Sequence, residues 1–157
     1  MTYDYYERWF RAKRRPVAPL TLTQARDAAA ARTLFTAVCR KGVAPVAFLE
    51  FNSDYVGVGF LDDLMREYLT YQFSEVEPGR LFLNMAVFRE YRAETDQIVN
   101  GSTYHFKPSG TVTILYDNIA AGKQSSVEKV AGVADNWEDY PAFGQYGRLL
   151  HIERLGK

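Results

Sequence analysis

Apolar and polar side chains alternate most regularly in two stretches that flank a Pro-Gly pair. Every second position is apolar from Leu69 to Phe73, and again from Leu81 to Val87 after the pair. A period of two is typical of half-buried strands. Pro78 fixes its φ at about −65°, and Gly79 accepts the positive φ of a type II turn. The pattern therefore predicts a hairpin over Arg66–Tyr91.

The segment that leads into this hairpin fits two different periods. From Leu61 to Phe73 the apolar residues also recur at helical spacing, and Asp62 and Asp63 can cap a helix there. The aromatic and β-branched side chains after Glu67 favour a strand instead. We expect a strand from Glu67, with a helix as the alternative over 62–73.

Helical spacing is clearest between Thr21 and Lys41. Thr21 and Gln24 have the spacing of a capping box, and Gly42 follows two basic residues at the other end. The apolar positions between these signals form one stripe, which includes Cys39. The pattern predicts a helix over 20–42.

The first nineteen residues form an arm that is rich in basic and aromatic side chains. Prolines at positions 16 and 19 end any helix that precedes them. We expect a short helix over Tyr3–Arg15, followed by an extended connector.

The remaining chain predicts more strands and a mixed tail. Strands are expected at Val46–Asn52 and Tyr55–Leu61, and a last hairpin joins Thr103–Lys107 to Thr111–Asp117. Gly57 and Gly59 lie on one face of their strand, where we expect an aromatic side chain or a helix to press against the backbone. Elsewhere we expect a loop over Arg89–Gly101, one or two helical turns over Val127–Ala134, and a strand or short helix over Leu149–Leu155.

Together these elements predict a single α+β domain over 1–157. The amino-terminal helices would pack on a curved antiparallel sheet of about six strands, formed by the meander at 45–117. A mixed aromatic segment, 118–157, would close the core, with Trp137 and Phe143 as buried closing residues. The length of 157 residues is ordinary for one domain.

The charges balance overall but not along the chain. Residues 1–41 hold nine Arg or Lys and three Asp or Glu, whereas residues 62–96 hold eight acidic and four basic side chains. A charge-rich segment is usually a solvated face, but carboxylates on one face also suit a basic partner. The predicted partner-binding residues are Asp62, Asp63, Glu67, Glu75, Glu77, Glu90, Glu94 and Asp96.

The sequence gives little support for catalysis, and we expect no catalytic residues, cofactor or metal. His105 and His151 are far apart, Cys39 is expected to be buried, and no metal-binding spacing is present. The acidic pairs suit a solvated surface better than glycoside chemistry. A phosphate-binding role for the arm at 11–15 lacks a helix-turn-helix or a stacking sheet, so nucleic-acid binding is not expected.

Composition also bears on location. One cysteine excludes an intramolecular disulfide, no apolar h-region follows the first methionine, and no 18-residue apolar run is present. We expect a cytoplasmic protein without a membrane partner. The oligomeric state is not specified by these patterns.

One stretch of the tail resembles a known class of proteins. Residues 136–146, NWEDYPAFGQY, contain the pattern W-x-x-x-P-x-F-G-x-Y. This segment is similar to the closing segment of small immunity proteins from bacterial polymorphic toxin and contact-dependent growth inhibition systems. The resemblance covers 43–150 in outline and implies a cytoplasmic, non-enzymatic protein. Such a protein binds a cognate toxin domain, in many systems a nuclease with a basic cleft, and occludes its active site.

The alternative function is a small-ligand carrier. In that case the aromatic sheet face, the two glycines and the Ala-rich helix would enclose an apolar cavity of roughly 300 Å³ or more. A filled core with exposed tyrosines and carboxylates would favour partner binding instead.

Overall fold

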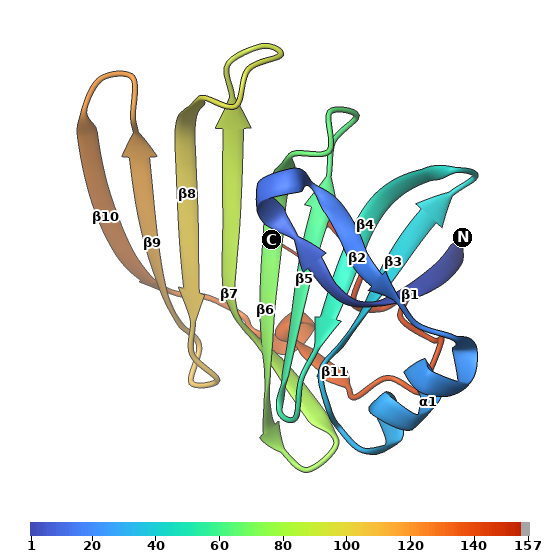
Figure 1. Cartoon of the computed structure of the whole chain (residues 1–157). Helices are drawn as coiled ribbons and strands as arrows, with labels where there is room; N and C mark the ends of the chain where they lie inside the picture. The colour runs from blue at the N-terminus through green and yellow to red at the C-terminus, as the bar shows by residue number, and fades with distance from the viewer. Residues whose placement is uncertain (155–157) are drawn as a thin grey trace.

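A computed structural model describes residues 1–154, and most of this chain is one antiparallel sheet (Figure 1). The strands follow the order β10-β9-β8-β7-β6-β5-β4-β3-β1-β2, with β11 paired to β7. Their bounds are β1 Thr2–Phe10, β2 Arg15–Pro19, β3 Phe35–Lys41, β4 Ala44–Phe51, β5 Tyr55–Leu61, β6 Glu67–Glu77, β7 Arg80–Tyr91, β8 Ile98–Phe106, β9 Thr111–Asn118, β10 Lys123–Val130 and β11 Trp137–Asp139.

Helices are short. The α-helix α1 spans Leu22–Ala30, and the 3-10 helices η1 and η2 span Arg11–Lys13 and Ala134–Asn136. Among residues 1–154, no helix is long and apolar enough to cross a membrane.

The prediction of amino-terminal helices packed on about six strands is wrong, because the sheet has eleven strands and α1 is the only α-helix among residues 1–154. The arm over Tyr3–Arg15 forms β1, η1 and the start of β2. Its alternate side chains Tyr3 and Tyr5 pack on one face of the sheet, so the alternation of a strand outweighed the basic and helical signals.

The helix predicted over 20–42 ends at Ala30. Thr21 caps it with the expected capping box, but Arg32 takes a positive φ of 54° and the chain turns into β3. Phe35–Cys39 is buried between β1 and β4, which pair with β3 on its two sides. A continuous apolar run does not distinguish a buried strand from a buried helix, which explains the error.

Several strands are confirmed. The hairpin β6–β7 begins at Glu67 and turns at Pro78 and Gly79, where Gly79 has a φ of 75°. The alternative helix over 62–73 is absent. The loop expected at Arg89–Gly101 is shorter than predicted, because β7 and β8 continue into it and leave only residues 92–97 as the connection.

The tail also differs from the prediction. Of the residues expected to form helical turns at Val127–Ala134, the first four belong to β10, and only Ala134 is helical, as the start of η2. Residues 149–154 form turns without a regular helix or strand, and Leu155 lies outside the described residues.

The two faces of the sheet are covered by different segments (Figure 1). The inner face packs against the segment that follows β10, and its core includes Tyr71, Phe73 and Leu83 together with Tyr146. The hairpin β1–β2 crosses the outer face, where Trp9 stacks on Phe48 with ring centroids 4.6 Å apart. The sheet therefore lies between the amino-terminal hairpin on its outer face and the carboxy-terminal segment on its inner face.

Gly59 shows why the outer face needs a glycine. A Cβ at this position would lie 2.4 Å from two ring atoms of Phe48, which is fully buried. The expected pressing of an aromatic side chain on the bare backbone is confirmed here.

The strand registers align inner-face side chains in rows across the sheet. One row stays buried or half-buried from β3 to β9 and becomes exposed at Val127 of β10. Its members are Ala37, Leu49, Val58, Tyr71, Ala86, Tyr104, Ile114 and Val127.

The next row loses its cover earlier. Phe60 and Leu69 are buried, but Phe88 of β7 and Tyr116 of β9 are 42% and 44% exposed. Ser102 of β8 lies between these two aromatic residues. The inner face is therefore uncovered over the part of β7–β9 that lies near the β7–β8 connection.

Candidate functional site

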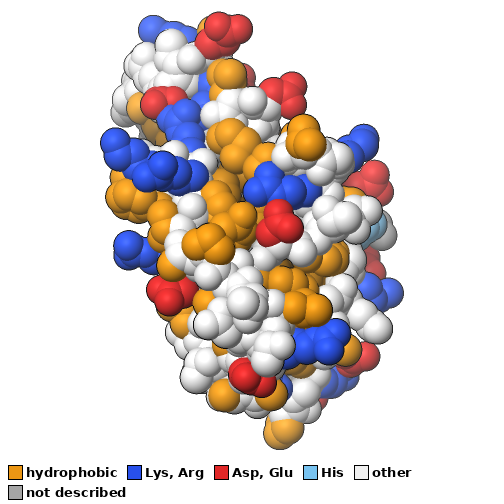
Figure 2. Space-filling view, turned by 45° about the vertical axis from the view of Figure 1, so that its right-hand side comes forward, with side chains coloured by type: hydrophobic (Ala, Val, Ile, Leu, Met, Phe, Trp, Pro, Cys, Tyr) orange, Lys and Arg blue, Asp and Glu red, His pale blue; other side chains and the backbone are white. Residues whose placement is uncertain are grey.

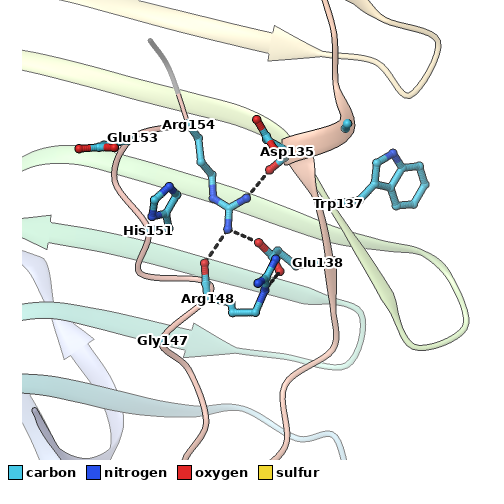
Figure 3. Close-up of a pocket in the computed structure, with 9 residues that line it drawn as sticks. Asp135, Trp137, Glu138, Gly147, Arg148, His151, Glu153 and Arg154 are labelled. Atoms are coloured by element: carbon cyan, nitrogen blue, oxygen red, sulfur yellow. Dashed lines mark hydrogen bonds and ion pairs between the residues drawn. The ribbon is translucent and has the colours of Figure 1, made fainter. Parts of the chain in front are cut away.

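A pocket of about 330 Å³ lies where residues 147–154 return to β11. Figure 3 shows the Arg154 guanidinium between Asp135, Glu138 and Arg148, with the Trp137 ring turned away. Arg154 donates to Glu138 Oε1 and to the Arg148 carbonyl, both at 2.5 Å, and also to the Asp135 carbonyl. The side chains of Arg154 and Glu138 are only 2% and 6% exposed.

This cluster attaches residues 148–154 to the sheet. Glu138 also accepts from Arg148 Nε at 2.7 Å, and the Tyr71 hydroxyl donates to the Ile152 carbonyl at 2.7 Å. Nearby, the Asn136 amide donates to the Leu83 carbonyl at 2.9 Å. Because its buried charges bind each other, the cluster suits a structural clamp better than a catalytic centre.

The structure brings six of the eight predicted carboxylates to one end of the sheet. They lie in the β5–β6 and β7–β8 connections or in the adjoining strand ends: Asp62, Asp63, Glu67, Glu90, Glu94 and Asp96. Glu75 and Glu77 lie at the opposite end, beside the β6–β7 turn.

Four of the eight are ion-paired within the chain. Asp62 accepts from Arg66 Nε at 2.7 Å, and Glu75 accepts from Arg32 Nη1 at 2.6 Å. Glu67 lies 3.4 Å from Arg11 Nε, and Asp96 pairs with Arg14. Basic residues of the arm therefore neutralise part of the acidic stretch.

These contacts shift the pKa values in different directions. Burial favours a raised pKa for Asp62, but hydrogen bonds from Arg66 and Leu64 and the charge of Arg66 outweigh it and lower the pKa. The hydrogen bond from Arg32 lowers the pKa of Glu75. Burial raises the pKa of Glu67, despite the opposing charge of Arg11.

Arg66 also fixes the two acidic connections to each other. Its Nη1 donates to the Ala93 and Thr95 carbonyls at 2.7 and 2.6 Å. Its guanidinium lies 4.5 Å from the Tyr91 ring centroid. The β5–β6 and β7–β8 connections therefore form one supported rim.

The other four predicted carboxylates have no ion pair with another residue in 1–154. Asp63, Glu77, Glu90 and Glu94 are exposed, and Glu90 accepts from the Asn100 amide at 3.1 Å. Asp63, Glu90 and Glu94 share the supported end of the sheet. These three are the carboxylates that a basic partner would meet without first breaking an ion pair.

Beside Glu90, the uncovered part of the inner face forms a shallow groove of about 270 Å³. We call this surface the open face, defined by Phe88, Glu90, Asn100, Ser102 and Tyr116. The alternation of β7 places Phe88 and Glu90 on one face, but no sequence signal shows where the covering tail stops. Sequence reasoning therefore missed this surface.

Two cations of the basic arm are ion-paired within the chain. Arg11 pairs with Glu50 and Glu67, and Arg14 pairs with Asp96. Figure 2 shows acidic, basic and hydrophobic side chains interspersed on the side that it displays.

The W-x-x-x-P-x-F-G-x-Y segment is a packing element, but its two predicted closing residues are only half-buried. Trp137 packs edge-on to Phe82 with ring centroids 5.0 Å apart, and Phe143 stacks on Tyr5 with ring centroids 4.8 Å apart. The fully buried member of the segment is Tyr146.

The cleft between α1, the sheet and the tail measures about 230 Å³. Arg26, Phe35, Phe51 and Tyr140 are among its lining residues. This is the place where the carrier hypothesis expects an enclosed cavity, but the cleft is smaller than that hypothesis requires.

The remaining reactive groups are dispersed. Cys39 is buried in β3, with its sulfur 3.3 Å from Met1 Sδ, and burial raises its thiol pKa. His105 and His151 are exposed on β8 and in the tail. No cluster of three or more His, Cys, Asp or Glu side chains in residues 1–154 could hold a metal ion.

Comparisons with protein-family models, with curated proteins and with solved structures find no match. The functional argument for this chain therefore rests on its own residues.

Proposed function

We propose that this chain is a non-enzymatic binding protein that neutralises a cognate toxin domain by occluding its active site. The observation that carries the proposal is the open face, where two large aromatic side chains stand exposed on paired strands. A cytoplasmic location is part of the proposal, as is the toxin class suggested by the tail segment.

The open face has the composition of a binding centre. Phe88 and Tyr116 flank Ser102 on strands that are hydrogen-bonded on both sides, so their backbones are already ordered before binding. Aromatic anchors on an ordered scaffold lose little conformational entropy when they are buried. Exposed hydrophobic groups that neighbour one another are also typical of interaction sites.

The charges near the open face favour a basic partner. Glu90 belongs to the open face, and Asp63 and Glu94 lie at the same end of the sheet. Carboxylates around an apolar centre speed association with a positively charged surface and disfavour other partners. A nuclease with a basic substrate cleft fits this description.

The proposal is tested by co-expressing the chain with the toxin domain encoded in the adjacent reading frame. The wild-type chain is expected to restore growth, and a Phe88→Ala, Tyr116→Ala double variant is expected to restore it much less. Leu34→Ala provides a matched control, because Leu34 is also exposed but precedes β3 at a distance from the open face. Full protection by the double variant, with its fold intact, would exclude the open face as the binding surface.

A further inference from the structure

The sheet ends in two strands of very different character. β2 is five residues long, contains Pro16 and Pro19, and has a positive φ at Ala18, so its outer edge is poorly suited to pairing. β10 is eight residues long, lacks proline, and pairs with β9 over its whole length without a register shift. Every residue of β10 is exposed.

The hydrogen-bond alternation shows which backbone groups of β10 face outward. Lys107 N donates to Thr111 O, so odd-numbered residues of β9 bond to β8 and even-numbered residues bond to β10. In the register with β10, the partners of these even residues are the odd residues Lys123 to Lys129. Ala131 N, which donates to Gly110 O, continues the same series.

The N–H and C=O groups of Gln124, Ser126, Glu128 and Val130 therefore point away from the sheet. No described strand lies beyond β10. An exposed edge of this length is a template for strand addition.

From this edge we propose that a second copy of the chain pairs with β10 in antiparallel register, with Val127 facing its own counterpart across the two-fold axis. Two identical antiparallel strands are related by a two-fold axis perpendicular to the sheet. One residue then faces its own counterpart at the axis, and every other pair joins two even-numbered or two odd-numbered residues. With Val127 at the axis, Ser126 pairs with Glu128 and Gln124 pairs with Val130. These are the residues whose backbone groups point outward.

The side chains favour this register over its neighbours. With Val127 at the axis, Lys129 faces Ser125 and Glu128 faces Ser126, so no like charges are opposed. Moving the axis to Ser126 places Lys123 opposite Lys129, and moving it to Glu128 places two glutamates face to face. Like charges directly opposite each other destabilise a strand pair.

Pairing would also complete a buried row. Val127 is 48% exposed and continues the inner-face row that includes Tyr104 and Ile114. In the dimer the two Val127 side chains cover each other, and both inner faces lie on the same side. This inference does not depend on the proposed function, because a monomer can also bind a partner through the open face.

Sedimentation velocity between about 1 µM and 1 mM tests the pairing, because a small interface predicts weak association. Ser125→Glu and Ser125→Lys form a matched pair, since residue 125 faces Lys129 of the other copy but Tyr116 within its own sheet. Glu is expected to strengthen the dimer and Lys to weaken it. Two symmetric contacts predict a change of about two- to thirtyfold in each direction.

A cysteine variant tests the register. Val127 would occupy a non-hydrogen-bonded pair with Cα atoms about 4.5 Å apart, which suits a disulfide. Val127→Cys is expected to form a disulfide-linked dimer on mild oxidation, whereas Gln124→Cys is not, and the native Cys39 is buried. A wild-type chain that stays monomeric up to 1 mM, or equal crosslinking of both variants, would overturn the proposal.

Discussion

Arg154 and Glu138 form a buried ion pair within the segment that covers the inner face, with Arg154 Nη2 donating to Glu138 Oε1 at 2.5 Å. The pair joins the last described residue to β11, which in turn pairs with β7. The ion pair therefore connects the carboxy-terminal segment, through β11, to the middle of the sheet.

Glu138→Ala is expected to destabilise the fold by about 3 to 5 kcal/mol, because it leaves the buried Arg154 guanidinium without its counter-charge. Arg148→Ala is the matched control. Arg148 donates to the same carboxylate, but its side chain is 85% exposed, so the expected cost is much smaller. Urea unfolding compares the two, and equal costs would show that the buried pair does not hold the tail.

Gly59→Ala is expected to destabilise the fold by about 1 to 3 kcal/mol, because its Cβ would overlap the Phe48 ring. Gly101→Ala is the control, since a Cβ there meets its nearest atom, the Phe88 carbonyl oxygen, at 3.6 Å. Melting temperatures measure both. A Gly59→Ala variant as stable as Gly101→Ala would mean that Phe48 does not press on β5.

Stability is expected to fall as the pH rises above about 10, because burial raises the pKa of Tyr71 to about 12. The unfolded chain ionises this hydroxyl first, so its contribution is fully present below pH 10 and is lost between about 10 and 12. Tyr71→Phe should make the pH dependence shallower in that interval. An unchanged dependence would show that the Tyr71 hydroxyl is not held away from water.

Local signals determined which parts of the fold were predictable. The Pro78–Gly79 turn and the flanking alternation specified the hairpin β6–β7, and the Thr21–Gln24 capping box specified where α1 begins. The end of α1 was not predictable, because Phe35–Cys39 is apolar at every position except Thr36. Only its pairing with β1 and β4 makes this segment a strand.

The candidate site was predicted only in part. The run of carboxylates is visible in the sequence, but pairs such as Arg14 with Asp96 join residues that are distant along the chain. The exposure of Phe88 and Tyr116 depends on where the tail stops covering the sheet. That boundary is a tertiary property without a local signal.

The central claim is that the open face and its nearby carboxylates bind a basic toxin domain. It is tested most directly by the association rate constant for the toxin domain encoded in the adjacent reading frame, measured by stopped flow at increasing salt concentration. The rate is expected to fall with salt, and reversal of Asp63, Glu90 and Glu94 to Lys should lower it about tenfold or more at low ionic strength. Asp27→Lys, on α1, should change it little. An association rate indifferent both to salt and to the three reversals would contradict the account.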